Sequence, residues 1–168
     1  SFQSNRVQHL RRMNFSSTYA NLPSNLTVAQ NLGFFARVYG VRDRRTRIRE
    51  LLDLFEIPHL SRSITGNLSS GESTRLNLCK ALLNRPDLLL LDAGLFGDEG
   101  RNLLTECRKD HPGLRCIVLA DDAEQVREAR VAGADAVFLK GFPADKFVRT
   151  VERLVFERKV YTDRDSSC

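Results

Sequence analysis

The second half of the chain alternates short apolar runs with amphipathic segments. The runs at 87–91, 116–120 and 136–139 have the length and continuous hydrophobicity of strands buried on both faces. Apolar residues recur at helical spacing in the segments 101–109, 123–132 and 144–157. Gly133 ends one of these helices and Pro143 begins another. This β-α-β-α-β-α order predicts a parallel sheet with right-handed crossovers and helices on both faces.

The first half is predicted to be mainly helical, with one short strand near 12–16. Thr27 caps a helix that Gly40 ends, and a second helix covers 44–55, where Pro58 follows. A loop over 61–68 precedes a third helix, which Ser69 or Ser70 caps and which runs to Leu83. The fold class is therefore α/β: a small parallel sheet of three to five strands, made of flavodoxin-like or P-loop-like β-α units, with a helical N-terminal lobe. Segments 1–86 and 87–168 are expected to pack as one domain.

Composition and charge narrow the class of protein. The chain has 168 residues, 42% of them hydrophobic and 28% charged, which is typical of a folded soluble domain. No apolar run approaches the roughly 18 residues that a membrane helix needs, so no membrane insertion is expected. The net charge of +5 divides unevenly, because residues 1–86 carry 13 Lys and Arg against 5 acids and residues 87–168 carry 13 against 16. This change of balance supports the division into two segments.

The arginine-rich stretch 42–49 could attract phosphate. It has no interleaved aromatic residues and no nucleic-acid motif, so a solvated helix face is the favoured interpretation and no nucleic-acid partner is expected. The four cysteines show neither CxxC spacing nor a neighbouring histidine, which argues against a metal site among them. They are interpreted as structural thiols of a protein in the reducing cytoplasm.

Three segments of the first half carry a family resemblance. They are 26–28 (Leu-Thr-Val), 68–72 (Leu-Ser-Ser-Gly-Glu) and 81–92, which ends in four leucines and Asp92. In order and spacing, residues 22–92 resemble the ATP-binding domain of ABC transporters. The resemblance implies that Ser69, Ser70, Gly71 and Glu72 contact the γ-phosphate of ATP held by a partner subunit, and that Asp92 helps to hold Mg²⁺. The alternative for Ser69–Glu72 is a plain capping box at a helix start.

Other parts of that family's chemistry are missing from these 168 residues. No GxxxxGK[ST] phosphate loop is present, and Ala93 stands where the family places its catalytic glutamate. No glutamine lies near Ser17–Thr18, and no switch histidine lies near Asp121. Autonomous ATP hydrolysis is therefore not expected, and neither is a tightly held cofactor, with Mg-ATP or Mg²⁺ left as the alternative.

The second half carries another resemblance. The strand that ends at Asp92, the Ala-Gly-Ala-Asp segment at 132–135 and Lys140 make residues 87–158 similar to a response-regulator receiver domain. The resemblance implies that Asp92 accepts a phosphoryl group and that Lys140 pairs with it. The receiver's acidic pair is absent, so Asp121 and Asp122 are the weak metal candidates beside Asp92. A strand-end ion pair is the favoured interpretation of Asp92 and Lys140.

The two resemblances meet at 84–92. The leading hypothesis is therefore a recombinant or designed chimera of ABC-ATPase and receiver fragments without catalysis of its own. One alternative is a degenerate ABC subunit that contributes its signature motif, Ser69–Glu72, to ATP on a partner ATPase subunit. Another is a receiver-like phosphoacceptor signalling module at Asp92. Because so small a sheet leaves exposed edges, a homodimer is also expected.

Overall fold

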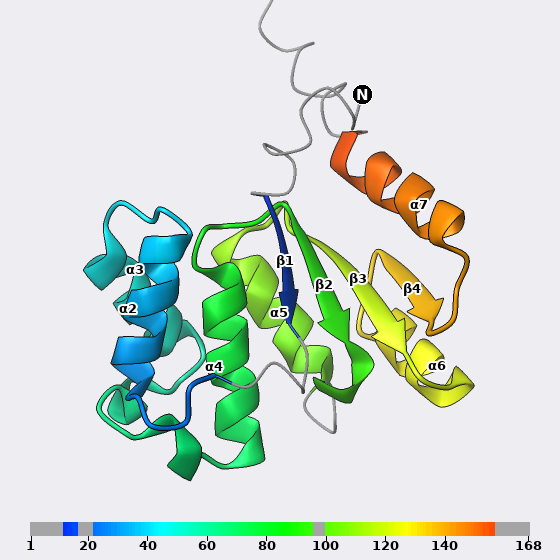
Figure 1. Ribbon diagram of the computed structural model, residues 1–168. Coiled ribbons are helices and arrows are strands. Elements are labelled where there is room, and N and C mark those ends of the chain that lie inside the picture. Colours follow the sequence, from blue (N-terminus) through cyan, green and yellow to red (C-terminus); the bar gives the residue numbers. More distant parts are fainter. Residues whose placement is uncertain (1–11, 17–21, 96–99, 157–168) are drawn as a thin grey trace, which may run out of the picture.

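A four-stranded parallel sheet forms the centre of the molecule (Figure 1). The computed structural model describes residues 12–16, 22–95 and 100–156. The strands are β1 (Met13–Ser16), β2 (Leu88–Asp92), β3 (Arg115–Ala120) and β4 (Ala136–Leu139), and they lie in the order β1-β2-β3-β4. The register pairs Met13 with Leu88, Leu89 with Cys116 and Ile117 with Ala136. The predicted small parallel α/β sheet is thus confirmed, with all four predicted strands in place.

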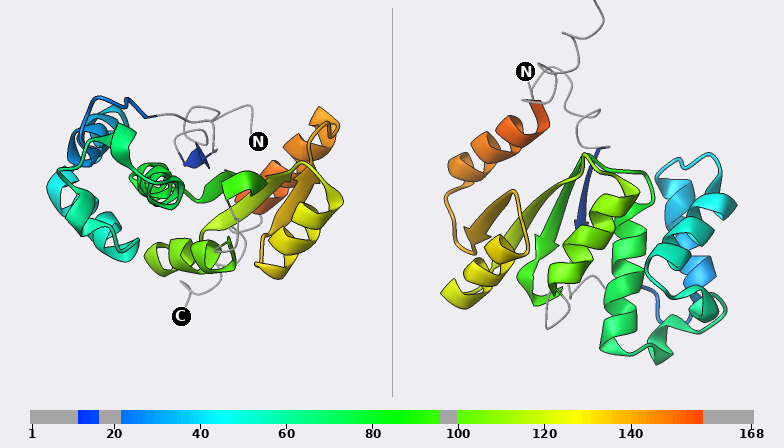
Figure 2. Two further views of the ribbon diagram at one scale, coloured as in Figure 1. Left: turned by 90° about the horizontal axis from the view of Figure 1, so that it is seen from below. Right: turned by 180° about the vertical axis from the view of Figure 1, so that it is seen from behind.

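Helices cover both faces of the sheet, as the sequence pattern predicts. On one face, Leu89, Leu91 and Val118 join a core with α5 (Gly100–Asp110) and α6 (Ala123–Val131). On the other face, Leu88 and Ile117 pack with α7 (Ala144–Phe156). The two views of Figure 2 show α7 on the side of the sheet opposite α5 and α6. Alternate residues of β2 and β3 therefore face different helices, which explains why these two strands are mostly apolar.

The helical lobe comprises α2 (Val28–Val38), α3 (Arg44–Leu54) and α4 (Ser70–Leu82). Thr27 forms a capping box with Gln30 at the start of α2, and Asp43 caps α3. Gly40 follows α2 with φ +68°, a left-handed conformation that glycine adopts without strain. These starts and stops agree with the sequence pattern to within one or two residues.

One feature of the lobe corrects the expectation from sequence. The helix α3 ends at Leu54, within one residue of the expected end, and Glu56 follows it in a left-handed conformation (φ 58°). Pro58 begins a 3₁₀ turn (Pro58–Leu60), and a second one (Thr65–Asn67) interrupts the predicted loop. Backbone hydrogen bonds from Thr65 to Leu26 and from Gly66 to Ser24 anchor this stretch to the segment before α2. The connection from α3 to α4 is therefore held against the start of α2.

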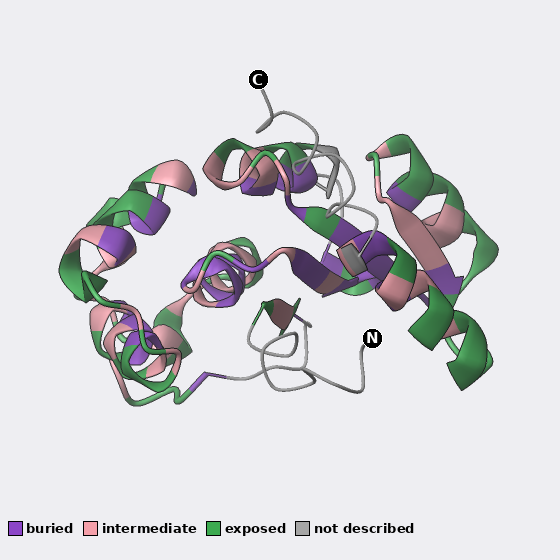
Figure 3. Cartoon of the chain, turned by 90° about the horizontal axis from the view of Figure 1, so that it is seen from above, coloured by how far each residue is buried: buried purple, intermediate pink, exposed green. Residues whose placement is uncertain are grey.

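The lobe and the sheet share one apolar core. The larger buried cluster includes Leu51 and Phe55 from the α3 region, Leu76 from α4, Leu89 from β2 and Leu104 from α5. Figure 3 shows the buried positions lining the inner sides of the lobe helices and running into the strands. No helix within the described residues combines the length and the apolarity that crossing a membrane requires.

A buried arginine connects the lobe to the sheet. Arg47 of α3 is 5% exposed, and its guanidinium donates to the carbonyl oxygens of Leu82 (2.6 Å) and Leu83 (3.2 Å) at the end of α4. The same guanidinium forms a bidentate pair with Asp110 at the end of α5, at 2.5 and 2.7 Å. Arg47 thus satisfies carbonyl groups that a helix end leaves without partners and fixes three helices together.

We predict that Arg47→Met lowers the free energy of unfolding by about 3–5 kcal/mol, because it leaves the Asp110 carboxylate, which is only 9% exposed, without its partner. The matched control is Arg85→Met. Arg85 is 61% exposed and pairs with Glu50 at 3.3 Å, so its loss costs less than about 1 kcal/mol. Urea unfolding of the two variants measures both values, and equal losses would contradict the role given to Arg47.

Candidate functional site

The start of α4 is an exposed, preorganised helix N-terminus. Ser69 Oγ accepts the backbone N–H of Glu72 at 3.3 Å, and the Glu72 carboxylate accepts the backbone N–H of Ser69 at 2.8 Å. Hydrogen bonds from the backbone and then from the side chain of Ser69 to the carboxylate lower the pKa of Glu72 below its ordinary value. Ser69 is therefore the cap, and the capping box expected from sequence is present.

The capping box leaves the next residues accessible. Ser69, Ser70 and Gly71 are exposed, and a Cβ atom added at Gly71 would meet nothing within 4 Å. The first-turn amides of a helix have no intrahelical acceptor, and the helix dipole favours an anion at this end. The four residues singled out from sequence thus lie together where a phosphate group can approach the backbone.

A second cluster lies at the carboxyl ends of three strands. Lys140, directly after β4, places its Nζ 2.9 Å from Asp92 Oδ2 at the end of β2 and 2.8 Å from Asp121 Oδ1 after β3. Asp92 is buried, and its Oδ1 accepts the backbone N–H of Gly94 at 2.9 Å. Hydrogen bonds to Asp121 and then to Asp92 raise the pKa of Lys140 well above its ordinary value. The structure therefore brings Asp92 and Lys140 together.

The third candidate acid of this cluster has a different partner. Asp122 caps α6 by accepting the backbone N–H of Gln125 at 2.8 Å. Asp92 and Asp121 both contact the Lys140 ammonium. Within the part of the chain that the structure describes, no three His, Cys, Asp or Glu side chains come close enough to hold a metal ion. A role of Asp92, Asp121 or Asp122 in binding Mg²⁺ stays a prediction.

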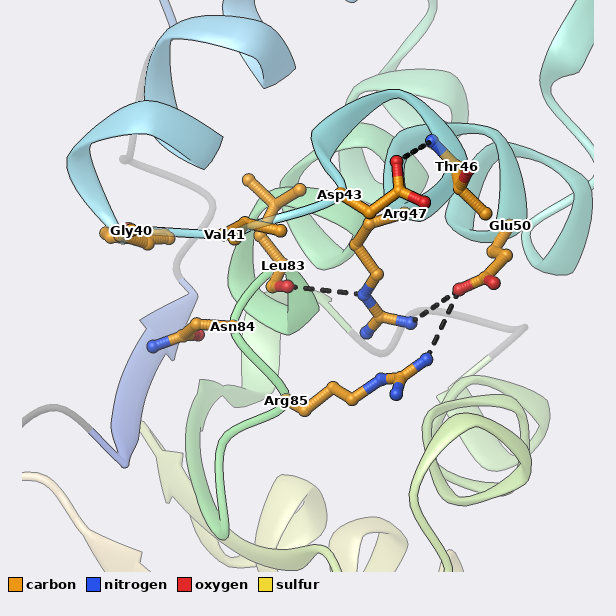
Figure 4. A pocket seen from close by; sticks show the side chains of 10 residues that line it. Gly40, Val41, Asp43, Thr46, Arg47, Glu50, Leu83, Asn84 and Arg85 are labelled. Atoms are coloured by element: carbon orange, nitrogen blue, oxygen red, sulfur yellow. Dashed lines mark hydrogen bonds and ion pairs between the residues drawn. The ribbon is translucent and has the colours of Figure 1, made fainter.

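A pocket of about 350 Å³ lies between α3 and the connection from α4 to β2 (Figure 4). Its charged groups pair with one another: Glu50 contacts Arg47 at 3.5 Å and Arg85 at 3.3 Å. Asp43 accepts the backbone N–H of Thr46. The pocket wall is thus part of the connection between lobe and sheet that Arg47 makes.

Arg47 corrects the interpretation of the basic stretch. The sequence suggested a solvated helix face, and Arg42, Arg44, Arg45 and Arg49 are indeed exposed. Arg47 is buried because it lies four residues before Leu51, which is fully buried, and so shares the inner face of α3. That spacing was the signal in the sequence that could have identified it.

Three cysteines are free, buried thiols: Cys79, Cys107 and Cys116. Burial raises the pKa of each, that of Cys116 to about 12. The thiolate is the reactive form, so these side chains are structural, as expected from their spacing.

Comparison with known proteins shows that the chain is similar to ATP-binding proteins of transporters. The family model described as ABC transporter matches residues 2–94. Nod factor export ATP-binding protein I of Burkholderia thailandensis is 34% identical over 106 residues, which cover 60% of this chain and 35% of the relative. Fe(3+) ions import ATP-binding protein FbpC of Streptomyces avermitilis is 33% identical over 139 residues, covering 72% of this chain and 40% of the relative.

Solved structures show the same fold. CbiO1 from Clostridium perfringens, described as part of the ABC transporter complex cbiONQ, matches with a TM-score of 0.63 and 21% identity. That match covers 91% of this chain and 67% of the other. A putative ABC transporter ATP-binding protein from Pyrococcus furiosus matches with a TM-score of 0.59 and 20% identity, over 79% of this chain and 64% of the other.

Sheet, helical lobe and capped signature motif together define an α/β protein of the ATP-binding-cassette class. The family match covers more than half of the chain, and the chain belongs to the ABC transporter family. It spans about a third of the length of the first curated relatives it matches.

The receiver resemblance and the chimera find no support in these comparisons. The structural match covers 91% of the chain, so an ABC-type fold accounts for most of the second half as well. The curated match over 72% of the chain likewise exceeds the segment 2–94. The explanation for the resemblance is local, because apolar strands that end in an aspartate are common to many parallel α/β sheets.

We predict that Asp121→Asn lowers the pKa of Lys140 toward the ordinary lysine value, because it removes the charge of a carboxylate that is hydrogen-bonded to the ammonium. A raised lysine pKa adds stability below the ordinary pKa, and that contribution disappears as the pH rises through the raised value. Titration of the Lys140 side-chain carbon signal by NMR measures the change. Asp122→Asn is the matched control, since Asp122 caps α6 instead. An ordinary titration of Lys140 in the unsubstituted chain would refute the arrangement.

Proposed function

We propose that this chain is part of an ABC transporter ATP-binding subunit and presents Ser69–Glu72 to ATP that is held by the phosphate loop of a partner ATPase subunit. Membership of the family and the exposed, capped start of α4 support this proposal. In this role the backbone amides of the first turn of α4 bind γ-phosphate oxygens, and the Ser69 side chain and Glu72 keep that turn in place.

The single observation that carries the proposal is the open space at Gly71. A glycine in the first turn of a helix costs stability relative to alanine. Nothing in the fold needs its small size, because a Cβ at this position meets no atom within 4 Å. The absence of a side chain there leaves the backbone of the first turn open to an approaching ligand. A terminal phosphate, whose oxygens must come within hydrogen-bond distance of the backbone, is such a ligand.

The groups that these 168 residues lack decide which parts of the ATP site the partner must supply. They contain no phosphate loop, and Ala93 follows Asp92 where the family has its catalytic glutamate. The phosphate cradle and the water-positioning group therefore come from outside them, and Mg-ATP is shared with the partner. Turnover requires the assembled subunits, and the site of action is the cytoplasm.

We predict opposite effects of Gly71→Ala on stability and on nucleotide binding. The free chain becomes more stable by about 0.5 kcal/mol, because alanine fits this helical position without strain. When a partner ATPase subunit with a phosphate loop is present to hold Mg-ATP, the response of the Ser70–Glu72 amides disappears, because the new methyl group occupies the path of the phosphate. Urea unfolding of the free chain and amide NMR shifts in the presence of that subunit give the two results.

Thr74→Ala is a control on the same helix, beyond the first turn, and it should leave the nucleotide response unchanged. An unchanged response in Gly71→Ala would contradict the proposal. So would a Mg-ATP titration, with the partner ATPase subunit present, in which the amides at the start of α4 never shift in the unsubstituted chain.

A second candidate function rests on the ion pair between Lys140 and Asp92 at 2.9 Å. In this alternative, Asp92 accepts a phosphoryl group and Lys140 neutralises its oxygens. Exposure to acetyl phosphate and Mg²⁺ distinguishes the two functions. The signature-motif proposal predicts no gain in mass. A gain of one phosphoryl group that Asp92→Asn abolishes would establish the alternative.

A further inference from the structure

A second concave surface lies in the lobe, apart from the start of α4. It is a groove of about 590 Å³ between α2 and α3. Arg37 lines it from α2, Arg42 from the connection between the helices, and Arg44 and Arg45 from the first turn of α3. Asp43 is the one acid of the lining, so the groove carries a formal charge of +3 from four arginines and one aspartate. We propose that this groove binds clustered phosphate groups.

The four guanidiniums are available to a ligand. All four arginines are exposed, and within the described parts of the chain their side chains form no ion pair. The neighbouring pocket is a useful contrast, because its two arginines, Arg47 and Arg85, are both paired with acids. The carboxylate of Asp43 is already used to cap α3. The positive charge of the groove is therefore not neutralised from within.

The arginines at the start of α3 lie at the end of the helix where the helix dipole disfavours a positive charge. Arg44 and Arg45 occupy its first turn, which contains no acidic residue. Cations at a helix N-terminus oppose the helix dipole, so this placement weakens the free fold. An anion in the groove would interact favourably with the arginines and with the helix end at once. A solvated helix face alone does not account for positive charge gathered at this end.

The floor of the groove leaves room for a ligand. Ala29 and Gly33 of α2 line it, and a Cβ atom added at Gly33 would meet nothing within 4 Å. A glycine within a helix costs stability, so the space above Gly33 is not required by packing. Compact phosphate groups fit a short groove with four guanidiniums better than a peptide does, because a peptide spreads its carboxylates along the chain. Guanidinium groups also bind phosphate oxygens in a bidentate manner.

Calorimetric titration with inorganic tripolyphosphate tests the groove. The double variant Arg37→Gln/Arg45→Gln should weaken binding by about a hundredfold, or about tenfold for each guanidinium removed. The matched control Arg49→Gln/Arg62→Gln removes the same charge from exposed arginines outside the groove and should change binding by less than about threefold. Gly33→Leu, which fills the groove without changing the charge, should also abolish binding while the circular dichroism spectrum stays the same.

Two further measurements distinguish a lipid source of phosphate from a soluble one, and the groove from the start of α4. Sedimentation with phosphatidylglycerol vesicles, compared with phosphatidylcholine vesicles, shows whether a lipid surface supplies the phosphates. Tripolyphosphate binding that depends on Arg37 and Arg45 shows a soluble source. Tripolyphosphate binding that Gly71→Ala weakens, while the groove arginines are intact, would assign the probe to the start of α4 and overturn the groove proposal. Equal losses in the two double variants, or no binding to either probe, would overturn the proposal.

Discussion

The bidentate pair between Arg47 and Asp110 is the interaction on which the arrangement of the molecule depends. A guanidinium that is buried needs full pairing, because an unpaired charge inside a protein is costly. Arg47 finds that pairing only when the end of α4 and the end of α5 lie against α3 together. The same helix α4 carries the capped signature motif at its other end. The interaction that joins lobe and sheet therefore also orients the surface proposed to meet ATP.

Much of the fold could be predicted from the sequence, because the hydrophobic pattern of its elements is strong. Three apolar strands, the capping box at Ser69 and the stop at Gly40 follow from local chemistry and appear as expected. The spacing of Arg47 from Leu51 signals its burial, but its partners could not be predicted, because they depend on where α4 and α5 end in space. The receiver resemblance finds no support, for a related reason. Local β-α patterns are shared among parallel sheets, so a resemblance over half of the chain does not distinguish one family from another.

The electrostatics of the candidate sites differ in one respect. In the cluster at the carboxyl ends of the strands, the charged side chains are paired with one another, since Lys140 contacts both Asp92 and Asp121. At the start of α4 and in the arginine groove, the positive charge is not fully neutralised by neighbouring groups. Both sites also leave space above a helical glycine, Gly71 or Gly33. The excess of basic residues in the first half of the sequence thus has two structural uses. One arginine holds the lobe in place, and four others form an exposed anion-attracting surface.

The central claim is that lobe and sheet form one cooperative unit, so that the signature motif is presented by a rigid support. Native-state hydrogen exchange tests it most directly. Amides of α4, such as that of Leu78, and of β3, such as that of Val118, should exchange with the same free energy of opening, equal to that of global unfolding. A lobe whose amides open at a distinctly lower free energy than those of the sheet would contradict the account.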